Sequence, residues 1–336
     1  MSLKPVVLAV AAGDNPPDLS GLDRTEVRLA APDQISRAIV GADALLVWDF
    51  AARGVEAALQ KADRLKWIHV SSTGVDHVLS PTVRSAPVLL TNARGVLDAA
   101  IAEYVLGLML IFAKDFLTTF ANQHRRVWKH RPTARLTGAR VLVVGPGSIG
   151  QTIGSLLTAV GMRVDAVGRT ARGPEGPFGE IFPQTRLADV VGSYDYLVLA
   201  APLTTDTRGM VDAKILKAMG RGARIINVSR GQLVVEKDLV AALEQGAIAG
   251  AALDVVTSEP LTEGSPLWTT PNTIISPHMA GDFFNWRQSL LEVFLENYDR
   301  FQRGQPLLNL VDKSLGFAQD RVASRDTKDL EGSVSK

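Results

Sequence analysis

The chain has 336 residues, of which 46 % are hydrophobic and 21 % charged, and its formal net charge at pH 7 is +1. This composition is typical of a globular protein long enough for two domains. The small net charge argues against a nucleic-acid or membrane partner. The absence of cysteine excludes disulfides and thiolate metal sites, and the five histidines show no ligand spacing such as HExxH, so we expect no metal.

The N-terminal segment MSLKPVVLAVAAG resembles a short signal peptide, with Lys4 before an apolar run and small residues after it. The run is at the short limit for such a peptide, and a buried first strand is the favoured interpretation. The longest apolar run, residues 105–113, is too short to span a bilayer. We therefore expect a cytoplasmic protein.

Short apolar runs alternate with amphipathic helical stretches along the chain. Apolar strands separated by helices are typical of parallel sheets that helices cover on both faces, so the sequence predicts an α/β fold. Helices are predicted at 148–160, 212–219 and 236–245, among others. Strands are predicted at 6–10, 44–48, 66–72, 88–92, 140–145, 162–168, 196–201, 224–229, 250–256 and 273–277.

Two longer helices are predicted to connect two lobes. One begins near Asp98, a favourable N-cap residue, and the other covers 285–304 and ends at Gly304. If the first helix leaves an N-terminal lobe and the second returns to it, residues 102–286 form an inserted domain.

The remaining residues complete the expected domain organisation. Residues 1–101 and 287–315 should together form the other domain. Residues 316–336 are polar and lack apolar periodicity, which predicts a flexible tail.

A glycine-rich turn, Gly145-x-Gly147-x-x-Gly150, lies between a predicted strand and a predicted helix, with a second strand following. The first glycine permits a tight turn, the second lets the backbone approach a pyrophosphate, and the third lets helix and strand pack closely. The helix N-terminus then offers N–H groups and a positive dipole end to the phosphates. This context predicts dinucleotide binding, the alternative being a glycine turn that binds nothing.

The end of the second strand of this unit indicates which dinucleotide binds. In NAD-binding units the strand ends in Asp or Glu, which hydrogen-bonds the ribose 2′-OH. Here Gly168 stands at that end, followed by Arg169, Thr170 and Arg172. Arginine can bind a 2′-phosphate by charge-assisted hydrogen bonds, whereas an acid would repel it. The pattern favours NADP(H), with NAD(H) possible if the arginines are only solvated loop charges or if Asp165, earlier in the strand, is the ribose ligand.

Three later segments each place an ionisable residue just past a predicted strand, namely Arg230, Glu259 and His278. Ligands of open α/β sheets bind outside the carboxyl ends of the strands, so we expect these residues to converge. Together they can orient an anion, tune a base and move a proton. Taken singly, they could be a loop cation, a surface acid and a packed histidine.

The order and context of these motifs resemble the D-isomer-specific 2-hydroxyacid dehydrogenase family, from about residue 40 to residue 310. The matching segments include SSTGVDHV, TNARGVLDAAIAEYVLGLML, VLVVGPGSIG, LAAPLTTDTRGMV, INVSRGQLVVEKDLVAALEQGAIAGAALDV, SEPL, SPLW and SPHMAG. VWDF, GRTARGPEG and SPLWTTPNTIISPH look most like the glyoxylate/hydroxypyruvate reductase branch, whose members typically prefer NADPH. The resemblance implies two Rossmann-like, doubly wound parallel-sheet domains with a cleft between them. Residues 102–286 would bind the dinucleotide, the other domain would bind the substrate, and the protein would form a homodimer.

The resemblance also implies roles for the candidate residues. Arg230 would bind the substrate carboxylate and polarise the C2 carbonyl, His278 would act as general acid or base, and Glu259 would orient His278 and favour its charged form. Asp254 would face the nicotinamide amide. The implied cofactor-binding residues are Gly145, Gly147, Ser148, Ile149, Gly150, Arg169, Thr170, Arg172, Pro202, Thr207, Val228, Ser229, Arg230, Asp254, His278 and Gly281.

The implied substrate pocket is less well defined than the cofactor site. Thr73 and Gly74 would offer backbone N–H groups to the substrate carboxylate, and Trp48 would form a pocket wall or else belong to the core. Val256 stands where many relatives carry an aromatic residue, and GDFFNW replaces a Thr-containing segment common in the family. These departures leave the identity of the substrate open.

The sequence therefore predicts NADPH-dependent reduction of a small 2-ketoacid, such as glyoxylate or hydroxypyruvate, to the D-2-hydroxyacid. A reductase of a larger 2-ketoacid is the alternative within the same class. A dinucleotide-sensing scaffold, similar to corepressors related to this family, is the alternative from another class.

Overall fold

The computed structural model describes residues 5–49 and 54–318, and the chain folds into two units. The first unit comprises Met1–Ala93 and Leu291–Lys336, and the second comprises Arg94–Leu290. In the described residues no helix is both long enough and apolar enough to cross a membrane.

The unit boundaries differ from the expected divisions at 101/102 and 286/287. The first division comes earlier because helix α4 (Asp98–Ala113) packs from its first turn into the core of the second unit, through Ile101 and Ala102. The second division falls inside helix α10 (Trp286–Gln302) rather than at its start.

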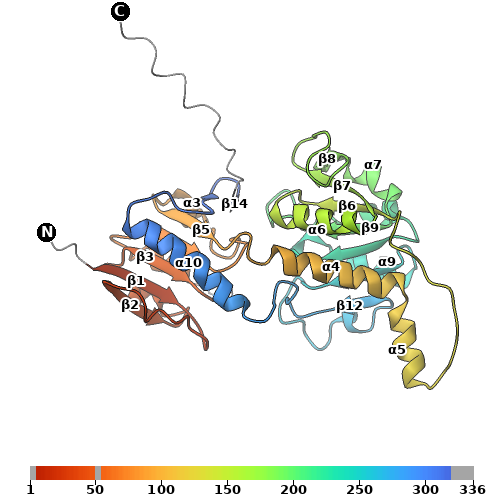
Figure 1. Cartoon of the computed structure of the whole chain (residues 1–336), viewed down its shortest axis with the longest axis horizontal. Helices are drawn as coiled ribbons and strands as arrows, with labels where there is room; N and C mark the ends of the chain where they lie inside the picture. The colour runs from red at the N-terminus through yellow and green to blue at the C-terminus, as the bar shows by residue number, and fades with distance from the viewer. Residues whose placement is uncertain (1–4, 50–53, 319–336) are drawn as a thin grey trace, which may run out of the picture. The chain divides into compact units, whose positions relative to one another are not determined.

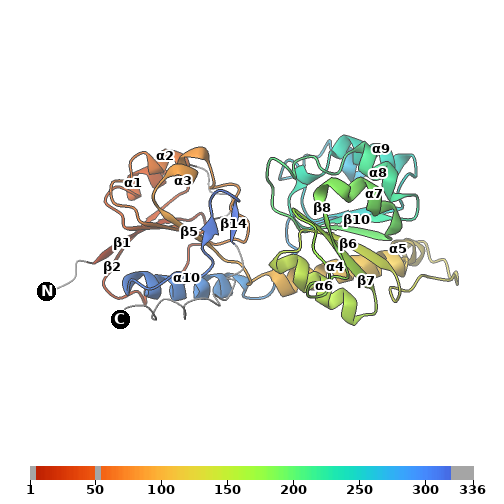
Figure 2. The ribbon, with the colours of Figure 1, turned by 90° about the horizontal axis from the view of Figure 1, so that it is seen from above.

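Within the described part of the first unit, five parallel strands form a sheet in the order β2-β1-β3-β4-β5. The order 2-1-3-4-5 is one of the two common doubly wound arrangements. Helices α1–α3 lie on one face of this sheet and α10 lies on the other (Figure 2). The strands are β1 (Val6–Ala11), β2 (Thr25–Ala30), β3 (Ala44–Val47), β4 (Trp67–Val70) and β5 (Leu89–Asn92), and the helices are α1 (Ile35–Ala38), α2 (Val55–Leu59) and α3 (Pro81–Ser85).

Alternation along β4 explains how one strand serves both faces of this sheet. Ile68 and Val70 belong to the apolar cluster under α1–α3. Trp67 and His69 point to the other face, where the Trp67 ring stacks on Phe294 of α10 with ring centroids 5.7 Å apart. Both faces of the strand are therefore buried, as the continuous apolar pattern predicts.

A short antiparallel pair follows α10 in the first unit. Strand β13 (Val311–Asp312) pairs with β14 (Phe317–Ala318), and Ala318 is buried in the same apolar cluster as Val311. The prediction of a flexible tail from residue 316 is therefore wrong for 316–318, because these apolar residues pack against the first unit. Residues 319–336 of the predicted tail lie outside the described residues.

The second unit contains, within the described residues, a parallel sheet of seven strands in the order β12-β11-β10-β9-β6-β7-β8. Counted from β6 as strand 1, this is the 3-2-1-4-5-6 order of dinucleotide-binding folds with a seventh strand added beyond strand 6. The order reverses between β6 and β9, where ligands of such sheets bind. The strands are β6 (Arg140–Val144), β7 (Arg163–Gly168), β8 (Ile181–Pro183), β9 (Tyr196–Leu199), β10 (Arg224–Asn227), β11 (Gly250–Leu253) and β12 (Thr273–Ile275).

Helices cover both faces of the seven-stranded sheet, with α4 and α6 on one side and α7–α9 on the other (Figure 2). Alternate residues of β6 feed two separate apolar clusters, with Val141 and Val143 on the α4 and α6 side and Leu142 and Val144 on the opposite side. The helices on these faces are α6 (Ser148–Ala159), α7 (Leu187–Val190), α8 (Ala213–Met219) and α9 (Glu236–Glu244).

Helix α5 (Phe116–His124) extends away from the seven-stranded sheet beyond the end of α4 (Figure 1). Asp115, between the two helices, has a left-handed backbone with φ +50°, which turns the chain sharply there. The loop after α5 carries Trp128 fully exposed, and Phe120 on α5 is 52 % exposed.

Candidate active site

The glycine turn joins β6 to α6 at the carboxyl edge of the second sheet. Gly145 has φ +103°, and a Cβ there would lie 2.7–2.8 Å from the backbone of Ala200 and Ala201. A Cβ on Gly150 would overlap the carbonyl oxygen of Gly145. A Cβ on Gly147, by contrast, would meet no atom of the described chain within 4 Å. Two glycines are thus required by the turn itself, while the third leaves the room that a pyrophosphate needs.

The first residue of α6 is tied to the first turn of α4. The Ser148 hydroxyl donates a hydrogen bond to Oδ2 of Asp98, whose side chain is buried. Leu97, not Asp98, is the N-cap of α4, so the predicted capping role of Asp98 is wrong. The carboxylate instead contacts the helix that follows the glycine turn.

Gly168 ends β7 beside the glycine turn. A Cβ on Gly168 would lie 3.1 Å from Pro146 and 3.3 Å from Ile181, so little space exists for an acidic side chain there. Asp165, the other candidate ribose ligand, accepts hydrogen bonds from Glu180 N and from the Tyr194 hydroxyl, both at 2.9 Å. Burial, together with this contact to Asp165, raises the pKa of the Tyr194 phenol. Asp165 therefore acts in the packing of the sheet edge.

The candidate ligands of a 2′-phosphate follow directly after Gly168. Arg169 and Thr170 are exposed on the surface. Arg172 is engaged by its own chain, because its Nη1 donates to both carboxylate oxygens of Glu175 at 2.9 and 2.7 Å. Glu175 was not singled out in the sequence, where it reads as an ordinary loop acid.

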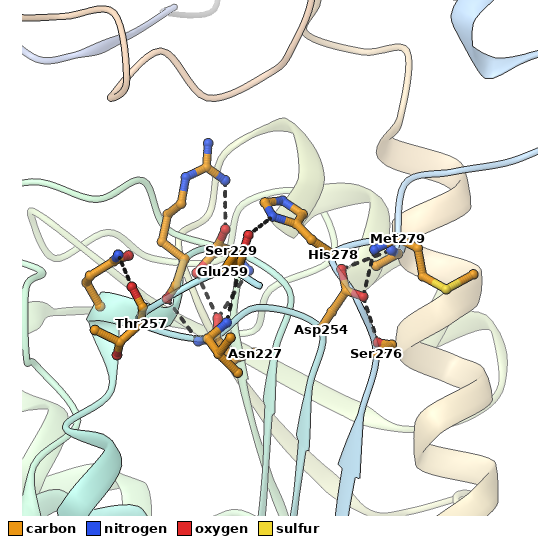
Figure 3. Close-up of polar contacts among 12 residues, drawn as sticks. Asn227, Ser229, Asp254, Thr257, Glu259, Ser276, His278 and Met279 are labelled. Carbon is orange, nitrogen blue, oxygen red and sulfur yellow. Dashed lines mark hydrogen bonds and ion pairs between the residues drawn. The ribbon is translucent and has the colours of Figure 1, made fainter. Parts of the chain in front are cut away.

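The turn after β10 positions Arg230. The buried Asn227 side chain donates to the Arg230 carbonyl oxygen at 2.9 Å and accepts from Ser229 N at 3.1 Å (Figure 3). Gly231 lies so close to the Val256 backbone that a Cβ would overlap it. Arg230 is thereby held between the ends of β10 and β11.

Glu259 and His278 point toward one another (Figure 3). Nδ1 of His278 lies 2.7 Å from Oε2 of Glu259, and both side chains are 38 % exposed. Burial alone would raise the pKa of Glu259, but the hydrogen bond and charge of His278, the Val256 N–H and the Arg230 charge together lower it. The structure therefore brings together a carboxylate and an imidazole suited to holding and transferring a proton.

Asp254 holds the backbone on both sides of His278. Its buried carboxylate accepts from the Ser276 hydroxyl at 2.6 Å and from Met279 N and Ala280 N at 2.9 Å (Figure 3). The Asp254 carbonyl oxygen accepts from His278 N at 2.8 Å. His278 has φ +54°, which is unusual for a residue with a side chain. These four hydrogen bonds stabilise that conformation.

The remaining predicted cofactor residues lie on the same edge of the second sheet. The Thr207 hydroxyl donates to the Pro202 carbonyl oxygen at 2.7 Å, so the two residues shape the turn after β9. Val228 follows β10 and belongs to the apolar cluster under α4 and α6. Gly281 packs against Leu97, where a Cβ would lie 3.1 Å from its Cδ1.

Comparisons with known proteins show the family of this chain. The family model for the NAD-binding domain of D-isomer specific 2-hydroxyacid dehydrogenases matches residues 106–280, more than half of the chain. The chain belongs to this family. It is 31 % identical over 289 residues to a glycerate dehydrogenase of Methylorubrum extorquens, covering 82 % of this chain and 87 % of that protein.

Two further relatives carry reductase names. A glyoxylate/hydroxypyruvate reductase A of Serratia proteamaculans is 28 % identical, covering 82 % of this chain and 88 % of that protein. An NADPH-dependent glyoxylate/hydroxypyruvate reductase of Sinorhizobium meliloti, solved with NADP and sulfate, has a TM-score of 0.80 and 28 % identity and covers 94 % of this chain and 100 % of that one. The dehydrogenase described here is thus an oxidoreductase that uses a nicotinamide dinucleotide, as the sequence predicts.

The predicted substrate residues of the dehydrogenase belong to its first unit. Thr73 and Gly74 follow β4, where Thr73 O accepts from the Asn92 side chain at 2.6 Å and Gly74 O accepts from the Ser72 hydroxyl at 2.7 Å. Trp48 is 9 % exposed and its indole N–H donates to the Asn15 carbonyl oxygen at 2.8 Å, which favours the alternative that it belongs to the core. Contact of these residues with a substrate stays a prediction.

Asp282 is a further carboxylate that the sequence analysis did not single out. Burial raises its pKa, Asp254 adds to the effect, and the nearby charges of Arg287 and His278 oppose it. It follows Gly281 in the segment that departs from the common family pattern, and no motif marked it.

Proposed function

We propose that this dehydrogenase reduces a small 2-ketoacid, with glyoxylate and hydroxypyruvate as leading substrates, to the D-2-hydroxyacid, and that it prefers NADPH. The observation that carries the proposal is the pairing of Glu259 with His278 at 2.7 Å in the same sheet edge as Arg230 and the glycine turn. The reductase names of the Serratia and Sinorhizobium relatives support the substrate class.

In the proposed reaction each of the three residues has a separate task. Arg230 binds the substrate carboxylate and polarises the C2 carbonyl through its guanidinium. His278 donates a proton to the carbonyl oxygen, and we assign this step to Nε2 because Nδ1 faces Glu259. Glu259 orients the ring and stabilises its charged form. The bound dinucleotide supplies the hydride that reaches C2.

The NADPH preference rests on the surroundings of Gly168. A Cβ at position 168 would lie 3.1 Å from Pro146 and 3.3 Å from Ile181, a tight fit for the acid that would bind a ribose 2′-OH, and cationic side chains follow at 169 and 172. The relative from Sinorhizobium meliloti, described as NADPH-dependent and solved with NADP, supports the same choice.

Steady-state kinetics test both parts of the proposal. We expect the highest kcat/KM for glyoxylate or hydroxypyruvate with NADPH, within a panel that also contains 2-ketoacids with longer aliphatic and aromatic side chains. A higher kcat/KM for one of the larger acids would support the alternative of a larger-substrate reductase. Dinucleotide binding without turnover of any ketoacid would support a sensing scaffold instead.

We further propose a homodimer built on the second unit. Phe116 and Phe120 of α5 stack with ring centroids 5.8 Å apart, yet Phe120 is half exposed and Trp128 fully exposed. An extended segment with this much exposed aromatic surface is typical of a protein interface.

A further inference from the structure

The positive charge of Arg172 is already contacted by an acidic residue of the same segment. Nη1 of Arg172 donates to both carboxylate oxygens of Glu175, at 2.9 and 2.7 Å. The side chains of Arg172 and Glu175 are 44 % and 40 % exposed, so solutes can reach the pair. An anion that binds the Arg172 guanidinium must therefore compete with the Glu175 carboxylate, which already contacts that group.

The backbone around this pair is hydrogen-bonded rather than extended into solvent. Arg172 and Ile181 exchange two N–H···O hydrogen bonds at 2.9 and 3.0 Å, and Glu175 and Phe178 exchange two at 3.2 and 3.1 Å. Residues 172–181 therefore form a hairpin that fixes the positions from which the two charged side chains extend.

The hairpin is anchored on the helix that follows the glycine turn. Phe178 is buried in the apolar cluster under α6, and Pro177 and Phe178 lie 2.8–2.9 Å from where a Cβ on Gly154 of α6 would be. Near the hairpin tip, a Cβ on Gly176 would lie 3.5 Å from the side-chain oxygen of Gln151, also on α6. The helix expected to bind the pyrophosphate thus also positions the Arg172–Glu175 pair.

The opposite end of the hairpin lies beside the end of β7. The Ile181 backbone exchanges two hydrogen bonds with the Arg172 backbone. The Ile181 side chain lies 3.3 Å from the position that a Cβ on Gly168 would occupy. In dinucleotide-binding units this strand end faces the 2′ position of the adenosine ribose. The pair is therefore held next to the place where NADP(H) and NAD(H) differ.

We propose that Glu175 weakens NADP(H) binding by competing with the 2′-phosphate for Arg172, and so limits the preference of the enzyme for NADP(H) over NAD(H). The inference deepens the proposed function and rests on its assignment of the 2′-phosphate to this region. An exposed ion pair is weak, so a phosphate can displace the carboxylate from the guanidinium. The displaced carboxylate stays close on the same hairpin and repels the phosphate. NAD(H) has no 2′-phosphate and is not affected by this repulsion.

The test compares Glu175→Gln with Glu180→Gln in the full-length protein. Glu180 lies on the same hairpin and is exposed, but the carboxylate that Arg172 contacts is that of Glu175, so the control removes an equal charge without touching the pair. The measurement is the dissociation constant, by calorimetry, of NADPH, NADH, adenosine 2′,5′-bisphosphate and adenosine 5′-monophosphate. Glu175→Gln should bind NADPH and the bisphosphate about three- to tenfold more tightly. It should leave NADH and the monophosphate within about twofold, and Glu180→Gln should leave all four within about twofold.

The double variant Arg172→Ala/Glu175→Gln tests the mechanism. If Glu175 acts by competing for Arg172, its replacement should give a smaller gain in NADPH affinity once the arginine is absent. Equal changes for NADPH and NADH, or the same gain in Glu180→Gln, would overturn the inference.

The result does not depend on whether the wild-type enzyme prefers NADPH, because each variant is compared with the wild type for the same ligand. A wild type that binds NADH more tightly than NADPH would contradict the proposed function. A selective gain of NADPH affinity in Glu175→Gln would support the inference even then.

Discussion

Nδ1 of His278 lies 2.7 Å from Oε2 of Glu259, and Oε1 of the same carboxylate accepts from Val256 N at 3.1 Å. One carboxylate is thereby bound both to the backbone after β11 and to the imidazole after β12. Since these contacts outweigh the effect of burial and lower the pKa of Glu259, it is ionised throughout the neutral range. The proposed proton donor thus has a permanent negative neighbour.

The first prediction concerns the pH dependence of ketoacid reduction. The reaction needs a proton on His278, and the Glu259 charge favours the protonated ring, so kcat/KM should fall as pH rises. Glu259→Gln keeps the side-chain shape and removes the charge, so the descending limb should move to lower pH. Asp282 and Arg230 also face this region and remain unchanged in the variant. Profiles for the variant and wild type with glyoxylate and NADPH give the measurement.

Glu263→Gln is the matched control for this experiment, because Glu263 follows in the same loop and is exposed. Its profile should overlay that of the wild type. If the Glu259→Gln profile does so as well, Glu259 is not the partner of the catalytic acid.

The second prediction concerns Asp254. Replacement by Asn puts an NH₂ group against one of the backbone N–H donors of Met279 and Ala280, so the segment holding His278 should shift. We expect kcat/KM to fall about tenfold or more, and stability to fall by about 1–3 kcal/mol. Ser276→Ala removes a single hydrogen bond and should cost about 1 kcal/mol. Kinetics and urea unfolding of both variants check this, and wild-type values for Asp254→Asn would show that it does not position His278.

Much of the fold follows from the sequence, because strands buried on both faces are continuous apolar runs. All ten predicted strands are present, with ends differing by a few residues. Four strands of the described residues were missed, namely β2, β8, β13 and β14, and none of them contains such a run. β2 is an exposed edge strand whose sequence TEVRLA includes two charged residues, and β8 has three residues that end in proline. Edge strands bury too little surface to give an apolar signal.

The chemistry of the site was also predictable in part. Arg230, Glu259 and His278 each follow a strand, and that placement is visible in a linear sequence. The roles of Asn227 and Asp254 were not, since each depends on hydrogen bonds to backbone groups of loops that only folding brings near. The pairing of Arg172 with Glu175 was hidden for a similar reason, because Gly173-Pro174 and Gly176-Pro177 indicate a turn but not which side chains it brings together.

The third prediction concerns the arginine at the end of β7. Arg169→Ala should weaken NADPH binding by about 1.5–3 kcal/mol and leave NADH nearly unchanged, because a charge-assisted hydrogen bond to the 2′-phosphate is lost. Arg163→Ala is the control, since Arg163 is exposed at the opposite end of the same strand. Equal losses for NADPH and NADH in Arg169→Ala would show that this side chain does not contact the 2′-phosphate.

The fourth prediction concerns assembly. Light scattering at micromolar concentration should give a particle of twice the 36.0 kDa chain mass. The double variant Phe120→Asp/Trp128→Asp should shift the particle toward the monomer mass, because charges would be placed on the exposed aromatic surface around α5. Leu29→Asp, at an exposed apolar residue of the first unit, should leave the mass unchanged. A monomeric wild type would refute the proposed homodimer.

The last prediction concerns a histidine that the proposed chemistry does not use. His69 is fully buried in β4, its Nδ1 lies 2.8 Å from the Thr91 hydroxyl oxygen, and Phe294 packs near its ring. Burial lowers the pKa of His69 to about 3. The folded state therefore keeps the ring neutral, while the unfolded chain takes up a proton below about pH 6.5. Between these two pH values the unfolded state binds more protons, so the free energy of unfolding should fall as the pH falls.

The size of this effect makes it measurable. Lowering the pH from 6.5 to 4 should remove about 3 kcal/mol of stability through His69 alone. His69→Phe removes the titrating group and leaves Thr91 its hydrogen bond from the Trp67 indole, so stability should fall less over the same range. His124→Gln, at an exposed histidine, should keep the wild-type dependence. Urea unfolding at pH 4, 5, 6 and 7 gives the slopes, and a wild-type slope in His69→Phe would mean that other groups cause the loss of stability in acid.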